Sequence, residues 1–199
     1  MNILLVYPDY PDGFWTFNHV LRKYTTYSCV SPPIGLLTVA AMLPKEWNLR
    51  LIDTNAKGKI RDKDIRWADY VFISAMHLQW DAVRCLVDRC KSFGVKTVAG
   101  GPLFTRDYQS FDDIDHLLLY EGEVCVPQFL EDIKNNTTKH IYDWVEFPDM
   151  RNSPVPRWDM INVNHYARLN LQYTRGCPFN CEFCGIGNLF GRKTRAKDA

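Results

Sequence analysis

Residues 1–133 alternate between short runs of consecutive apolar residues and longer segments in which apolar residues recur with helical spacing. Residues 2–6 form such a run, which is typical of a parallel strand buried on both faces of a sheet. The same pattern predicts strands at residues 48–53, 69–75, 95–99 and 115–120. Helices are predicted between strands, from Pro32 to Pro44, at residues 79–93 with Gly94 as the stop, and at 123–133.

Strands separated by helices favour a parallel sheet with helices on both faces. We therefore predict an α/β domain over residues 1–133, with a flavodoxin-like (Rossmann-like) sheet of five strands in the order 2-1-3-4-5. In such a sheet the ligand site lies beyond the carboxyl ends of strands 1 and 3. The loop at residues 7–31 is long and rich in aromatic residues. It is expected either to cover a ligand and line an apolar pocket, or to pack against another domain.

The regular pattern stops at residue 134. Residues 134–164 are polar and proline-rich, which predicts a linker draped on both of its neighbours. Residues 165–199 are assigned to a second domain. Within it, residues 169–174 alternate between apolar and polar side chains, which predicts a strand leading into a loop at Arg175 and Gly176.

Composition narrows the class of protein. The chain of 199 residues is 46% hydrophobic and carries a net charge of +1. No apolar run approaches the ~20 residues that span a bilayer, and no secretion signal is recognisable. Seven cysteines without such a signal favour a reducing, cytoplasmic location and metal chemistry over disulfides. The basic residues near the C-terminus lack interleaved aromatics, so we expect a solvated face there and no nucleic-acid partner.

Three of the cysteines, Cys177, Cys181 and Cys184, lie on one short loop. Three thiolates are one fewer than the four that close a 4Fe–4S cluster, which would leave one iron open to a small molecule. A structural zinc site is the alternative, but it requires a fourth ligand such as His165 or Cys125. Unliganded thiols are the third possibility.

Small and polar residues gather where the predicted strands end. Paired glycines after strand 4 remove side chains, so a flat or bulky ligand could lie against the backbone. A dinucleotide site is not indicated, because no G-x-G-x-x-G follows strand 1. We expect the following strand-end residues to bind a cofactor: Tyr7, Pro8, Ser74, Ala75, Met76, Gly100, Gly101, Pro102, Glu121, Gly122 and Glu123.

The cysteine spacing, with Phe183 before the last cysteine, resembles the signature of radical S-adenosylmethionine enzymes. The resemblance implies that the three cysteines hold a 4Fe–4S cluster, that its open iron binds S-adenosylmethionine, and that Phe183 lies beside this cofactor. Residues 32–36, 100–102 and 121–123 resemble a cobalamin-binding domain of the kind that precedes such barrels. Residues 14–17, 99–105 and 154–159 look closest to the hopanoid methyltransferase branch.

The resemblance implies a class B type of C-methyltransferase that acts on an unactivated carbon of a small-molecule or lipid-like substrate. Two departures from the family pattern matter. None of the five histidines lies in a D-x-H-x-x-G motif, so a histidine ligand to cobalt is not expected. Only 15 residues follow Cys184, so residues 165–199 are expected to be the start of a partial TIM barrel. We assign no catalytic residue, and expect the chain to be a truncated copy, a gene fragment or half of a split protein that is not catalytic by itself. In the last case a second chain would supply the rest of the barrel.

Two other functions remain open at this point. The chain could be a non-catalytic cobalamin-binding module, in which corrinoid binding would survive loss of the three loop cysteines. It could also be an interaction domain stabilised by zinc.

Overall fold

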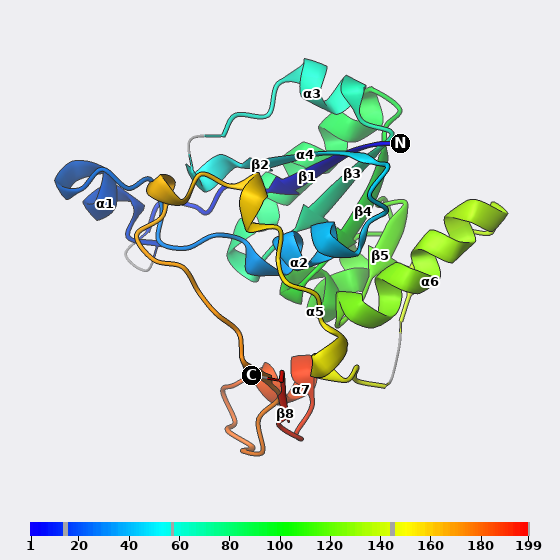
Figure 1. Cartoon of the computed structure of the whole chain (residues 1–199). Helices are drawn as coiled ribbons and strands as arrows, with labels where there is room; N and C mark the ends of the chain where they lie inside the picture. The colour runs from blue at the N-terminus through cyan, green and yellow to red at the C-terminus, as the bar shows by residue number, and fades with distance from the viewer. Residues whose placement is uncertain (14–15, 57, 144–145, 199) are drawn as a thin grey trace.

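The computed structural model describes residues 1–13, 16–56, 58–143 and 146–198. Its centre is a sheet of six parallel strands in the order β2-β1-β3-β4-β5-β6 (Figure 1). The strands are β1 (Asn2–Tyr7), β2 (Asn48–Asp53), β3 (Tyr70–Ser74), β4 (Lys96–Gly100), β5 (His116–Leu118) and β6 (Ile141–Tyr142). The predicted α/β class and the order 2-1-3-4-5 are confirmed, and β6 extends the sheet beyond β5.

Both faces of the sheet are covered, which explains the uninterrupted apolar run in β1. Leu4 and Val6 point into one core cluster, whereas Ile3 and Leu5 point into the other. All four side chains are 0% exposed. Because neighbouring side chains of a strand point to opposite faces, a strand between two helical layers has no polar face.

Five helices form the two layers. α3 (Asp62–Trp67), α4 (Trp80–Ser92) and α5 (Pro102–Asp107) pack on one face, and α2 (Ile34–Met42) and α6 (Gly122–Asn135) on the other. The buried side chains of α4 follow the predicted spacing, and Gly94, with φ of +66°, follows its end. A left-handed glycine at this place ends a helix at little steric cost.

Four short α-helices of the described residues were not predicted: α1 (Asn18–Tyr24), α3, α5 and, near the C-terminus, α7 (Ile186–Phe190). α3 and α5 have six residues each, too few to establish a periodic pattern. α1 lies inside the loop at residues 7–31, and it extends away from the sheet domain in Figure 1. Val20 and Tyr24 of α1 are 49% and 71% exposed, so the side chains described in this helix form no buried stripe. Phe14 and Trp15, part of the expected aromatic surface, lie outside the described residues.

The segment at residues 134–164 contains β6 and packs against the sheet domain. The Tyr142 hydroxyl of β6 donates a hydrogen bond to Asp132 at 3.0 Å. Further on, the backbone N–H of Arg157 donates to the carbonyl of Leu37 in α2 at 3.1 Å. A strand of two residues gives no alternation, so it could not be recognised from the sequence.

The strand predicted at residues 169–174 is wrong for all but its last residue. β7 (Thr174–Arg175) pairs antiparallel with β8 (Arg195–Ala196), apart from the main sheet. Leu169, Leu171 and Tyr173 are 50%, 87% and 59% exposed. The alternating apolar side chains face no core, and a strand forms only where a partner accepts its backbone hydrogen bonds. With α7 (Ile186–Phe190), the two strands form a small lobe beside the sheet domain (Figure 1).

Among the helices of the described residues, none is long and apolar enough to cross a membrane.

Candidate functional site

A large cavity of about 920 Å³ lies at the carboxyl edge of the sheet. Parallel sheets of this topology bind ligands at this edge, near the point where the strand order reverses between β1 and β3. The volume is at the upper end of the range for small-molecule sites. Ten of the predicted strand-end residues line the cavity: Tyr7, Ser74, Ala75, Met76, Gly100, Gly101, Pro102, Glu121, Gly122 and Glu123.

Glycine backbone forms part of the cavity wall at the end of β4. Gly101 has φ of +98°, and a Cβ there would lie 3.0 Å from Ser74 Oγ. At Gly100 a Cβ would lie 2.9 Å from the carbonyl oxygen of Leu118 in β5. Side chains are therefore excluded at both positions, and a ligand can approach the main chain closely.

The start of α2 lines another part of the cavity through Pro33, Gly35 and Leu36. These positions carried the family resemblance in the sequence, but their place in the wall was not predicted. Phe17 and Leu21 of the α1 region, together with Arg168, Gln172 and Phe190, also contribute. No local pattern could have identified the last three, because they reach the cavity only when the C-terminal lobe packs beside the sheet.

Pro8 is the one strand-end residue of the predicted site that does not line the cavity. It is buried, and its carbonyl accepts hydrogen bonds from Asn55 Nδ2 at 2.9 Å and Gln79 Nε2 at 2.5 Å. Its neighbour Tyr7 does face the cavity, where its hydroxyl lies 2.6 Å from that of Tyr10. Burial raises the pKa of Tyr7, so the phenol is neutral at physiological pH.

One of the five histidines, His77, lines the cavity. Its Nδ1 lies 3.2 Å from a carboxylate oxygen of Asp107, and its side chain is 57% exposed. His77 is not part of a D-x-H-x-x-G motif, but it places an imidazole at the cavity rim.

Asp53 is buried at the end of β2 and, among the described residues, has no cation as a partner. It accepts hydrogen bonds from the backbone and side-chain nitrogens of Asn55 at 2.9 and 3.0 Å and from the Tyr166 hydroxyl at 3.0 Å. Burial raises the pKa of Asp53 despite these donors. Tyr166 thereby connects the segment that precedes the cysteine loop to the sheet domain.

The raised pKa of Asp53 predicts a pH-dependent stability. A carboxyl group whose pKa is higher in the folded state stabilises the fold when protonated, and this contribution is lost as pH rises through the folded pKa. We expect Asp53→Asn to remove this loss. The free energy of unfolding of the variant should therefore rise relative to that of the wild type as pH increases from 4 to 7. Urea unfolding at several pH values measures this. Asp88→Asn, at an exposed position of α4, is the control. A pH-independent difference for Asp53→Asn would contradict the prediction.

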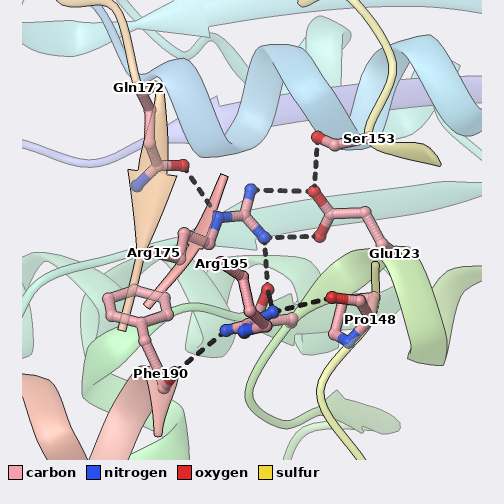
Figure 2. A network of polar contacts seen from close by, with 8 residues as sticks. Glu123, Pro148, Ser153, Gln172, Arg175, Phe190 and Arg195 are labelled. Atoms are coloured by element: carbon pink, nitrogen blue, oxygen red, sulfur yellow. Dashed lines mark hydrogen bonds and ion pairs between the residues drawn. The ribbon is translucent and has the colours of Figure 1, made fainter. Parts of the chain in front are cut away.

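Glu121 and Glu123, predicted to face a ligand, form ion pairs with the C-terminal lobe (Figure 2). Nη1 of Arg175 lies 2.6 Å from Glu121 and 2.8 Å from Glu123, and Nη2 lies 2.8 Å from Glu123. Arg195 also pairs with Glu121, and Ser153 donates to Glu123 at 2.7 Å. Burial alone would raise the pKa of Glu123, but the hydrogen bonds and charge of Arg175 hold it below its ordinary value.

The three loop cysteines lie outside the cavity wall. Cys181 and Cys184 are exposed, Cys177 is half-buried, and the backbone N–H of Cys184 donates to the carbonyl of Cys181 at 3.1 Å. Phe183 is 94% exposed and likewise does not line the cavity. In the part of the chain that the structure describes, no three His, Cys, Asp or Glu side chains are close enough together to hold a metal ion.

The donor set still fits an iron–sulfur cluster in its chemistry. Thiolates are the ligands that iron–sulfur clusters and zinc prefer, and accessible thiols spaced by four and three residues can be drawn around one centre. A zinc site with Cys125 as fourth ligand fits less well. Cys125 is buried in the core beside α2, and its thiol donates to the carbonyl of Leu119 at 3.1 Å.

Known proteins that are similar to this chain are named as methyltransferases. The chain is 37% identical over 200 residues to an uncharacterized methyltransferase of Synechocystis sp., covering 100% of the chain and 37% of that protein. It is 32% identical over 199 residues to the hopanoid C-2 methylase of Rhodopseudomonas palustris, covering 98% of the chain and 38% of that protein. It is 25% identical over 174 residues to bacteriochlorophyllide d C-8(2)-methyltransferase of Chlorobaculum tepidum, covering 83% and 38%.

No family model matches the chain. The chain spans less than two fifths of the length of these relatives. The expected resemblance to methyltransferases is confirmed, and along nearly all of its own length this chain is similar to one part of proteins named as methyltransferases, the hopanoid C-2 methylase among them.

Proposed function

We propose that this chain is the cobalamin- and cluster-binding portion of a radical S-adenosylmethionine enzyme, a C-methyltransferase that acts on an unactivated carbon. The observation that carries the proposal is the cavity at the carboxyl edge of the sheet, with glycine backbone in its wall and a loop of three cysteines nearby. The similarity to methyltransferases supports it, because the whole cavity-forming domain lies within the similar region.

The shape and chemistry of the cavity suit a corrinoid. A large, flat ring with apolar faces needs a wide slot with backbone close on one side and apolar side chains on the other. Gly100 and Gly101 supply the close backbone, and Pro33, Leu36 and Val39 supply apolar surface. These residues would bind and orient the ring and exclude water from it.

Cys177, Cys181 and Cys184 would hold a 4Fe–4S cluster with one open iron for S-adenosylmethionine. Such a cluster supplies one-electron reduction of a sulfonium, and a corrinoid supplies a transferable methyl group. The role of this chain would be to hold both groups near one another, with the cysteine loop anchored beside the cavity by Glu121 and Glu123.

Because the chain spans less than two fifths of its relatives' length, methylation itself is proposed for an assembly in which further polypeptide completes the barrel. The exposed side chains of Leu169, Leu171 and Tyr173 would meet that polypeptide. A small-molecule or lipid-like substrate and a reducing, cytoplasmic setting belong to the same proposal.

A second candidate is a corrinoid-binding module without radical chemistry. One observation favours it: none of the three loop cysteines lines the cavity, so a ligand there needs no contact with them. Corrinoid binding would then persist in a chain without these cysteines.

Metal content after anaerobic reconstitution with iron, sulfide and hydroxocobalamin tests the proposal. We expect about one cobalt and about four irons per chain, with iron–sulfur absorbance in the visible spectrum. Cobalt without iron would support the corrinoid-binding module instead. Zinc in place of both would refute the proposed function.

Gly101→Ala is expected to weaken hydroxocobalamin binding about tenfold or more, because it strains the backbone at φ of +98° and places a methyl group 3.0 Å from Oγ of Ser74, which also lines the cavity. Binding is followed by absorbance titration. Gly13→Ala is the matched control, since its Cβ would meet a neighbour at 4.0 Å and the residue does not line the cavity. Equal affinity of a folded Gly101→Ala protein and the wild type would contradict the assignment of this wall to the corrinoid.

A further inference from the structure

The two arginines of the C-terminal lobe face each other across its small sheet. Arg175 of β7 and Arg195 of β8 are register partners in the antiparallel ladder. Like charges directly opposite one another destabilise such a pair, and an isolated ladder of two strands is marginal even without them. The β7–β8 pair, two residues long on each side, is therefore unstable unless something outside it neutralises both guanidinium groups.

The neutralising groups come from the sheet domain. Glu121 and Glu123 stand at the start of α6, and their carboxylates form ion pairs with both arginines. Figure 2 shows Glu123 facing the guanidinium group of Arg175. The four side chains are well buried, with exposed fractions of 2% for Glu121, 7% for Glu123, 9% for Arg175 and 14% for Arg195. Two positive and two negative charges balance, so each buried charge depends on the others.

Closure of the cysteine loop depends on the same ladder. β7 ends at Arg175, two residues before Cys177, and the backbone N–H of Cys177 donates to the carbonyl of Gly191 at 3.1 Å. Directly after β8, the backbone N–H of Lys197 donates to the carbonyl of Tyr173 at 2.9 Å. These bonds join the two ends of the loop that carries the cysteines.

We propose that Glu121 and Glu123 act with Arg175 and Arg195 as a charge clamp, which closes the base of the cysteine loop and holds it at the cavity rim. The clamp makes closure of the loop conditional on contact with the sheet domain. Glu121, Glu123 and Arg175 also line the cavity, so the clamp stands between the cavity and the loop. The inference goes beyond the proposed function, because it concerns the chain without any cofactor.

Amide hydrogen exchange of the whole chain tests the clamp. In Glu123→Gln, Arg175 loses one of its two charged partners in a buried place, which leaves Glu121 alone to balance two arginines. We expect the amides of Cys177 and Lys197 to exchange about 100-fold faster or more, while the amides of β1 and β3 change by less than about twofold. Alkylation of the half-buried Cys177 should accelerate in parallel, with the exposed Cys85 as internal standard.

A double variant separates the loss of charge balance from a loss of packing. Glu123→Gln combined with Arg175→Gln removes one charge of each sign, so we expect it to recover much of the protection that Glu123→Gln alone loses. Arg157→Gln, which breaks the exposed pair of Arg157 with Asp159, is the control and should leave exchange of Cys177 unchanged. Unchanged exchange in Glu123→Gln, or a double variant as unprotected as the single one, would overturn the clamp. Either result can be obtained without cobalamin or iron, so it is distinct from a failure of the proposed function.

Discussion

Replacement of Cys181 by alanine is expected to abolish nearly all iron–sulfur absorbance after anaerobic reconstitution. Three thiolates are the fewest ligands with which such a loop can hold a 4Fe–4S cluster, and two leave half of the iron corners without a protein ligand. The described residues bring no other His, Cys, Asp or Glu side chain into a group with these cysteines that could substitute. The measurement is iron and labile sulfide per chain together with the visible spectrum.

Cys85→Ala is the matched control for this prediction. Cys85 is also an exposed thiol, but it lies on α4, away from the cysteine loop. The Cys85→Ala protein should retain the full iron content of the wild type. Retained iron–sulfur absorbance in Cys181→Ala would count against the cluster assignment. Because Cys181 does not line the cavity, the variant should bind hydroxocobalamin normally.

Gly176→Ala is expected to open the base of the cysteine loop. Gly176 has φ of +86°, and a Cβ at this position would collide with the backbone carbonyl oxygen of Lys193. The left-handed conformation costs an alanine roughly 1–2 kcal/mol, and the clash with backbone adds to this because a carbonyl cannot rotate away as a side chain can. We expect alkylation of Cys177 to accelerate at least about tenfold and the reconstituted iron content to fall to less than half.

Gly187→Ala, in α7 between the cysteines and β8, serves as the control. Its nearest contact would be an ordinary one, 3.7 Å from the flexible side chain of Arg192, and no positive φ is required there. Its iron content and thiol reactivity should match those of the wild type. Wild-type behaviour of Gly176→Ala would mean that the cysteines take up iron without a closed loop. An equal loss of iron and an equal rise in Cys177 alkylation in both variants would indicate that this segment tolerates no added side chain anywhere. The role assigned to the β7–β8 ladder would then be wrong.

The sheet could be predicted from the sequence because its signal is local. A strand buried on both faces, such as residues 2–6, must be apolar at every position, and the prolines around α2 mark its ends. β6, α3 and α5 escaped prediction because two to six residues are too few for a period to appear. Residues 169–174 show the opposite error. Their alternation is real, but no partner strand or apolar layer among the described residues meets residues 169–173, so a strand forms only from Thr174.

The candidate site, like the fold, was predicted only in part. The position of the cavity followed from strand order, and paired glycines at Gly100 and Gly101 indicated a close approach to backbone, which the structure shows as a wall. Pro8 follows the same strand end as Tyr7 but is buried against Asn55 and Gln79. Position along a strand fixes the edge at which a residue lies, whereas the direction of its carbonyl or side chain depends on neighbours distant in sequence.

From the sequence alone come the strands and their order, the edge at which the cavity lies and the spacing of the three thiols, since each follows from local patterns along the chain. Only the tertiary structure decided the use of Glu121 and Glu123. Arg175 and Arg195 lie more than fifty residues from them, and nothing local distinguishes a carboxylate that binds a ligand from one that binds an arginine. Buried charges must be balanced in space rather than in sequence, and for this reason packing of the lobe on the sheet domain determines which of them meet.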